Sequence, residues 1–267
     1  MSIFAVVYAS LVGLAVGSFV NVVVSRVPAG ASLLTPSRCD SCGAPVRAWQ
    51  NVPVLAWLAL RGRCRECQAP IGARTPLVEA GTGAAFAAIT AWTGTVTDGL
   101  GHALLAVTLC AFAAVSIALA LIDLDTHRLP DAVVGPAYPV AAALLAGTSG
   151  ATGDWGALAR AGVGLVVLAL GYYAVHVVRP DGMGFGDVKL AGLIGLVTGY
   201  VGWGALAVGA FAAFVLAGGY GVALLATGRA DRRSGLAFGP WMLAGGWLGL
   251  VAGAPLAAGY LQMSGLS

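Results

Sequence analysis

Residues 102–122 read HALLAVTLCAFAAVSIALALI, and Asp123 follows at once. From Gly99 to Ile122 the chain holds no Lys, Arg, Asp or Glu. A helical run of about 20 apolar residues matches the thickness of the hydrocarbon core of a bilayer. The stretch therefore predicts a membrane-spanning helix that ends in an acid.

The composition extends this prediction to the whole chain. Of its 267 residues, 59% are apolar and only 9% are charged, whereas a soluble domain carries roughly a quarter charged residues. We expect an all-α integral membrane protein with about eight transmembrane helices and one small cytoplasmic insert between the first two. The first helix should remain uncleaved, because Arg26 follows its apolar run and no basic residue precedes it. The expected helices cover residues 3–25, 77–96, 102–122, 132–148, 156–177, 188–203, 205–227 and 237–260.

The basic residues predict the orientation. When the polar insert is placed in the cytoplasm and the helices alternate, every Lys and Arg except Arg160 falls in a cytoplasmic segment. Cytoplasmic loops of membrane proteins carry such an excess of basic residues. We expect three parts: a first helix over residues 1–25, the insert over 26–76 and a membrane domain over 77–267. No internal repeat is apparent.

Two C-x-x-C pairs lie in the insert, Cys39-Asp-Ser-Cys42 and Cys64-Arg-Glu-Cys67. Their spacing favours a structural zinc ion held by four thiolates. Thiols in the cytoplasm are kept reduced, so a metal site or a redox pair is favoured over disulfides. An insert of this size also has too small a core to fold unaided, and a metal would supply folding energy. Cys110, inside an expected helix, is interpreted as a packing residue.

Three aspartates lie where apolar runs end or begin. Asp123 and Asp125 follow the third run, and Asp187 directly precedes Val188. An acid at membrane depth is costly and is a functional candidate, although a residue at a helix end can also reach water. Asp123 and Asp125 point about 200° apart on a helix, so only one can face Asp187. We favour Asp123 and interpret Asp131 as a helix cap.

The expected topology brings Asp123 and Asp187 to the same membrane face. Two approaching carboxylates share a proton, so that one acts as a base on water while the other stays an acid, which is the chemistry of aspartyl peptide hydrolysis. By their positions on their own helices, we expect Asp123 protonated and Asp187 ionised. Gly184 and Gly186 permit positive φ and close approach of an extended substrate. Lys189 is a second candidate for positioning the substrate, or an anchor at the inner leaflet.

Several segments together resemble the prepilin peptidase family of GxGD-type membrane aspartic proteases. They are Gly17-Ser-Phe-Val-Asn21, the cysteine insert with Asn51-Val-Pro-Val-Leu-Ala-Trp57, Pro76-Leu-Val-Glu79, Ile122-Asp-Leu-Asp-Thr-His-Arg-Leu-Pro-Asp131, Gly184-Phe-Gly-Asp187-Val-Lys189 and Phe238-Gly-Pro240. They occur in the order that the family has and span nearly the whole chain.

The resemblance implies a function and a set of site residues. The family cleaves the leader of type IV prepilins and type II secretion pseudopilins after a glycine, on the cytoplasmic side of the bacterial inner membrane. The methylating members then transfer a methyl group from S-adenosylmethionine to the new N-terminus, and the presence of the cysteine insert favours this bifunctional form. The resemblance implies that Asp123 and Asp187 are catalytic, that Cys39, Cys42, Cys64 and Cys67 hold zinc, and that residues 26–76 belong to the methyltransferase function and 77–267 to the peptidase.

Two other functions fit parts of the sequence. A proton-coupled transporter could use Asp123 and Asp187 as a relay, but transporters commonly have repeated halves and sites at the membrane midplane. A membrane-anchored zinc module could bind nucleic acid or protein through the arginines of the insert. Those arginines are equally explained by the cytoplasmic location, and we expect no nucleic-acid partner. The expected partners are prepilins or pseudopilins and the lipid bilayer.

Overall fold

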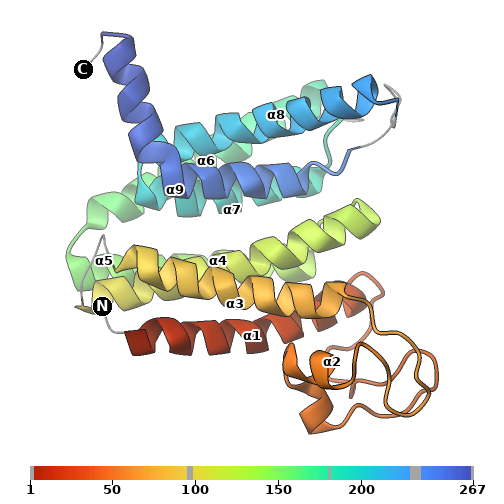
Figure 1. Cartoon of the computed structure of the whole chain (residues 1–267). Coiled ribbons are helices and arrows are strands. Elements are labelled where there is room, and N and C mark those ends of the chain that lie inside the picture. The colour runs from red at the N-terminus through yellow and green to blue at the C-terminus, as the bar shows by residue number, and fades with distance from the viewer. Residues whose placement is uncertain (1–2, 95–98, 180–181, 229–235, 266–267) are drawn as a thin grey trace. The chain divides into compact units, whose positions relative to one another are not determined.

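The computed structural model describes residues 3–94, 99–179, 182–228 and 236–265, and nearly all of its regular structure is helical (Figure 1). The helices are α1 (Ile3–Arg26), the short 3₁₀ helix η1 (Ala48–Asn51), α2 (Leu55–Ala59), α3 (Arg74–Thr93), α4 (Gly99–Thr126), α5 (Asp131–Thr152), α6 (Trp155–Val178), α7 (Phe185–Val201), α8 (Trp203–Ala226) and α9 (Gly239–Met263).

The expected all-α membrane fold is confirmed, but the count of eight spans is not. Within the described ranges, six helices are long and apolar enough to cross a membrane: α1, α4, α5, α6, α8 and α9. Helices α3 and α7 occupy the second and sixth expected positions and do not qualify. Helix α7 has 17 residues, and α3 begins with polar turns that include Arg74 and Glu79. The expected cytoplasmic loop with Arg229, Arg232 and Arg233 lies outside the described residues.

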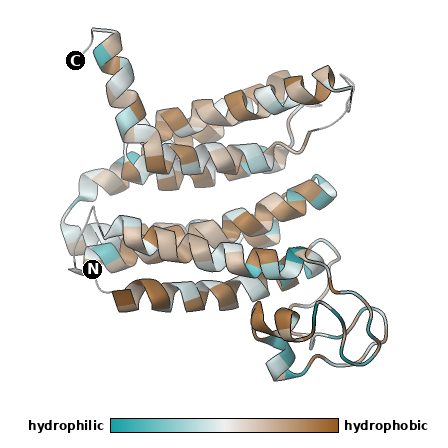
Figure 2. Ribbon diagram, in the orientation of Figure 1, coloured by the Kyte–Doolittle hydropathy of each residue, from teal (hydrophilic) through white to brown (hydrophobic). Residues whose placement is uncertain are grey.

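The chain divides into two compact units, Met1–Ala118 and Leu119–Ser267, and helix α4 contributes to both. In the first unit α1 and α3 lie side by side. The two helices approach so closely that a Cβ added at Gly17 would lie 2.7 Å from the Cα of Glu79. Figure 2 shows apolar residues along these helices and more polar residues over the loops between them. Small residues at such contacts are typical of helices that pack in a membrane.

The second unit is built around α7. From Asp187 to Tyr200 its residues are buried, with Lys189 as the exception, so this helix is covered by protein on all sides. Helices α6 and α7 lie side by side, as do α8 and α9. A Cβ at Gly164 of α6 would overlap the carbonyl oxygen of Gly195 in α7. A short helix that protein surrounds can therefore hold an acid near its start without exposing it to lipid.

The contact at Gly164 yields a test of this packing. Gly164→Val inserts a side chain between two touching backbones, so we expect it to lower the free energy of unfolding by about 1–3 kcal/mol or more. Gly162→Val on the same helix is the matched control, because an added Cβ at Gly162 meets no atom within 4 Å. Thermal unfolding of both variants in the same detergent measures the difference. Equal melting temperatures would show that α6 and α7 are not in close contact.

Candidate functional site

The Asp123 side chain lies in the last turns of α4 and is buried, with 5% of the residue exposed. Its Oδ2 atom accepts a hydrogen bond of 3.0 Å from the backbone N–H of Gly239, the first residue of α9. The N-terminus of a helix carries a partial positive charge and suits a carboxylate. Asp123 therefore lies at the end of one helix and faces the start of another.

The Asp187 side chain lies in the first turn of α7, and 9% of the residue is exposed. Its Oδ2 atom accepts a hydrogen bond of 3.1 Å from the backbone N–H of Gly184, the residue that precedes the helix. The carboxylate thus satisfies one of the N–H groups that a helix start leaves unpaired. The bond also fixes the loop before α7 against its own first turn.

The structure brings the two acids together. Asp123 and Asp187 are both buried, and Leu129 packs against Gly186, the neighbour of Asp187, and against Gly239, which bonds Asp123. Asp125, two residues along α4, is exposed. Two buried carboxylates in electrostatic contact cannot both ionise easily, and such a pair binds and exchanges a proton. The arrangement can therefore supply an acid and a base at one place.

The glycines before Asp187 serve a purpose different from the expected one. Gly184 has φ −71°, an ordinary value, and Gly186 lies within the first turn of α7. The requirement at Gly186 is space, because an added Cβ would lie 3.0 Å from the Cβ of Leu129. Gly184 does not use the positive φ that a glycine permits, and Gly186 makes room for the Leu129 side chain. The close approach of a substrate at these glycines stays a prediction.

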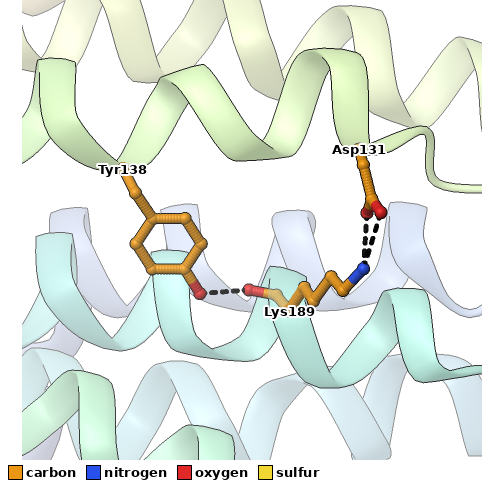
Figure 3. A network of polar contacts seen from close by, with 3 residues as sticks. All are labelled: Asp131, Tyr138 and Lys189. Atoms are coloured by element: carbon orange, nitrogen blue, oxygen red, sulfur yellow. Dashed lines mark hydrogen bonds and ion pairs between the residues drawn. The ribbon is translucent and has the colours of Figure 1, made fainter.

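The Lys189 side chain is bonded to Asp131 (Figure 3). Its Nζ atom lies 2.6 Å and 2.8 Å from the two carboxylate oxygens, and the hydroxyl of Tyr138 donates to the Lys189 carbonyl at 2.5 Å. Asp131 and Tyr138 belong to α5, so this network joins α5 to α7. The expected cap role of Asp131 is wrong, because its side chain makes no cap hydrogen bond and is occupied by Lys189.

The second cluster consists of Cys39, Cys42, Cys64 and Cys67. Their sulfur atoms all lie within 4.8 Å of one another, and the thiols are free of disulfide bonds. The Sγ atoms of Cys39 and Cys67 are 3.8 Å apart. Sulfur atoms at about 2.3 Å from a tetrahedral metal ion are about 3.8 Å from each other. The cluster therefore fits a metal ion, and Cys110 is buried elsewhere, in α4.

A repeat that the sequence analysis missed builds this cluster. Residues 38–45 read RCDSCGAP and residues 63–70 read RCRECQAP. Each segment forms the same hairpin, closed by a bridge between its Arg and its Pro. The residue after the second Cys has positive φ in both: Gly43 at 69° and Gln68 at 59°. Comparing the two C-x-x-C flanks letter by letter would have revealed it.

Backbone N–H groups prepare one thiol of the cluster for a metal. The N–H groups of Cys42 and Ser41 point at the Cys39 sulfur and lower the pKa of its thiol to about 7. The thiolate is the form that binds metal ions. The turn geometry of the first hairpin therefore favours the charged ligand.

Glu79 fixes the cysteine insert to the helices. The residue is 5% exposed, and its Oε2 atom accepts a hydrogen bond of 2.6 Å from the N–H of Val54. Val54 has φ 61°, which is unfavourable for a β-branched residue, and the charged hydrogen bond offsets that strain. Two further bonds reinforce the junction, from the Trp57 indole to the Ile71 carbonyl and from the Asn21 amide to the Thr75 carbonyl.

Fold and site together define a polytopic membrane protein with paired buried carboxylates and a four-thiol cluster. Residues 11–93 match the bacterial peptidase A24 N-terminal domain, and residues 110–222 match the type IV leader peptidase family. The first match contains the four cysteines, and the second contains Asp123 and Asp187.

Curated relatives resemble nearly the whole chain. A prepilin leader peptidase/N-methyltransferase of Pseudomonas putida is 33% identical over 96% of this chain and 94% of its own length. The protein of the same name from Burkholderia pseudomallei is 35% identical over 97% of this chain and 88% of its own. No solved structure gives a significant match. The chain belongs to the type IV leader peptidase family, and the resemblance inferred from its motifs is confirmed.

The bond between Lys189 and Asp131 gives a prediction for the role of Lys189. Its side chain is 36% exposed and that of Asp131 is 70% exposed, so we expect a coupling of only about 0.2–1 kcal/mol between them. A double-mutant cycle of Lys189→Met and Asp131→Asn, followed by thermal unfolding, measures this value. If Lys189 serves only this pair, both single variants lower prepilin cleavage equally. A larger loss in Lys189→Met alone would show a separate contact with substrate.

Proposed function

We propose that this protein cleaves the leader of type IV prepilins and type II secretion pseudopilins after a glycine, with Asp123 and Asp187 as the catalytic pair. The observation that carries the proposal is the pair of carboxylates buried at the end of α4 and the start of α7, where Leu129 packs against both Gly186 and Gly239. Membership of the type IV leader peptidase family supports the substrate class. The excess of basic residues in the insert supports a site on the cytoplasmic face of the bacterial inner membrane.

The proposed reaction is peptide hydrolysis by a shared proton. The ionised carboxylate takes a proton from water, and the resulting hydroxide adds to the scissile carbonyl carbon. The protonated carboxyl of the partner gives its proton to the carbonyl oxygen. The C–N bond of the tetrahedral intermediate then breaks: the amine leaves with a proton from the first carboxyl, and a hydroxyl of the intermediate returns its proton to the partner carboxylate. The products are the leader with a terminal glycine and a pilin with a free N-terminus.

Both acids accept hydrogen bonds from N–H groups at helix starts. The helix dipoles therefore do not determine which of the two carboxyl groups is the acid and which is the base. The expectation that Asp123 is protonated considered only α4, whose C-terminal end disfavours an anion. The N–H of Gly239 in α9 opposes that effect, just as Gly184 bonds Asp187. The two carboxylates therefore titrate as a pair, and the proton belongs to the pair as a whole.

The loop before α7 is our candidate for positioning the substrate. Gly184 is exposed and has no side chain beside Asp187, Gly186 packs against Leu129, and Lys189 lies two residues after the acid. An extended peptide that lies along this loop would bring its scissile bond to the carboxylates. The ion pair with Asp131 limits what Lys189 contributes to such a contact.

We also propose that the cysteine cluster holds a structural zinc ion and that the chain methylates the new N-terminus. Cys39, Cys42, Cys64 and Cys67 would hold the ion, which stabilises an insert with little core of its own. The names of the relatives support methyl transfer, and S-adenosylmethionine would supply the methyl group. None of the described residues is assigned to the binding of S-adenosylmethionine.

Cleavage of a prepilin in membranes tests the catalytic pair. We expect Asp123→Asn and Asp187→Asn each to lower the cleavage rate by about 100- to 10,000-fold, the usual contribution of an acid or base. Asp125→Asn is the matched control, because it removes an exposed carboxylate from the same end of α4. Mass spectrometry of the product reports cleavage and, with S-adenosylmethionine present, the added methyl group. Normal cleavage by folded Asp123→Asn and Asp187→Asn would refute the proposed pair, and solute uptake by such protein in vesicles would favour a transporter.

Metal analysis of the purified chain tests the zinc proposal. We expect about one zinc ion per chain in the wild type and a large loss in Cys42→Ser, because a structural site needs all four ligands. Cys110→Ser should retain the metal, since Cys110 is buried in α4. Zinc removal by a chelator should also increase proteolysis within residues 26–76. A wild type that is free of zinc, or a Cys42→Ser variant that keeps it fully, would contradict the assignment.

A further inference from the structure

The start of α9 offers one backbone donor to Asp123. A helix leaves the N–H groups of its first turn without partners in the helix. In α9 the second residue is Pro240, which has no N–H. The N–H groups of Trp241 and Met242 both donate to the carbonyl of Phe238 at 3.1 Å. The N–H of Gly239 remains, and it donates to Oδ2 of Asp123 at 3.0 Å.

Position 239 has no room for a side chain. A Cβ added there would lie 2.8 Å from Oδ2 and 3.3 Å from Cγ of Asp123, and 3.4 Å from Cδ2 of Leu129. Since no carbon atom tolerates an oxygen at 2.8 Å, any other residue would displace the carboxylate. The glycine is therefore required by contact with the acid.

Aromatic rings hold this helix start in place. Phe238, which precedes Gly239, lies 5.5 Å from Phe214 of α8 and 6.2 Å from Tyr172 of α6, measured between ring centroids. Tyr172 and Phe214 are 5.4 Å apart. Tilted rings at these distances attract one another. Because Phe238 directly precedes Gly239, the aromatic cluster fixes the backbone that bonds Asp123.

We propose that Gly239 is a positioning residue of the peptidase site, whose N–H and missing side chain hold the Asp123 carboxylate in its reactive place. The inference rests on the proposed catalytic role of Asp123. A donor fixed by the fold keeps a reacting group oriented without reorganisation during the reaction. Phe238 anchors the segment, Gly239 contacts the acid, and Pro240 removes a competing donor. This gives the Phe238-Gly-Pro240 motif a physical purpose.

Gly239→Ala tests the inference in the full-length protein in membranes. We expect kcat for prepilin cleavage to fall by about 10- to 100-fold, because a shift of about 1 Å in a reacting group can cost that much. KM should remain unchanged, since the substrate contacts are intact. Gly259→Ala is the matched control on α9, because an added Cβ there meets no atom within 4 Å. Infrared spectra with labelled aspartate should show the carboxyl band that Asp123→Asn removes, shifted in Gly239→Ala and unshifted in Gly259→Ala.

The outcomes separate this inference from the proposed function. A wild-type kcat in Gly239→Ala, or a loss that appears only in KM, would overturn the positioning role while leaving the catalytic pair intact. Normal cleavage by Asp123→Asn would instead remove the proposed function itself. If Gly239→Ala fails to fold, Phe214→Leu loosens the aromatic cluster and should lower kcat by a smaller factor at constant KM. Phe211→Leu, at a more exposed position on the same helix, is its control, and equal kcat in these two variants would overturn the inference.

Discussion

A carboxylate buried among membrane helices has no bulk water to bond, so the protein must supply its hydrogen bonds. In the second unit, a backbone N–H at a helix start supplies such a hydrogen bond to each of two carboxylates. Asp187 bonds the N–H of Gly184 at the start of α7, and Asp123 bonds the N–H of Gly239 at the start of α9. Helix starts are the one place where backbone donors are free, since helices otherwise use them internally. The positions of α7 and α9 are therefore tied to the positions of the acids, and the rest of the unit has to hold those two helix starts near each other.

Close backbone packing meets that requirement. Helix α7 is too short to span a bilayer comfortably, but it is buried by its neighbours, and glycines let α6 approach it at Gly164, Gly195 and Gly199. At the far end of α7, Arg160 donates to the carbonyls of Gly199 and Tyr200 at 2.8 Å and 2.7 Å. Both ends of the helix are thus satisfied by protein. Arg160, the one basic residue that the charge pattern predicts outside the cytoplasm, thus caps the C-terminal end of this buried helix.

The sequence predicted correctly those features that depend on the residues of a single segment. Apolar runs located the long helices, C-x-x-C spacing located the thiol cluster, and helical geometry separated Asp123 from Asp125, which the structure leaves buried and exposed respectively. It was weak where the decisive partner lies far along the chain. The bond from Gly239 to Asp123 joins residues 116 positions apart, and dipole reasoning confined to α4 could not include it. The count of eight spans is not confirmed for a related reason, because α7 is buried by protein and its 17 residues are fewer than a membrane span usually has. The repeat of residues 38–45 and 63–70 can be recognised in the sequence. It is a repeat of short turns, whereas the repeats expected in a membrane protein are repeats of helices.

Glu79 shows that burial of an acid near a membrane does not by itself indicate catalysis. It is as buried as Asp123, but its carboxylate bonds the N–H of Val54, whose positive φ would otherwise be unfavourable. That bond fixes the insert to α3, while Gly17 of α1 packs against the Cα of the same glutamate. Three of the motifs that resemble the family therefore meet at one structural junction. The proposed catalytic pair differs because it consists of two buried acids, Asp123 and Asp187, in the same unit. Proton sharing requires a second acid, whereas the Glu79 carboxyl group accepts a hydrogen bond from a backbone donor.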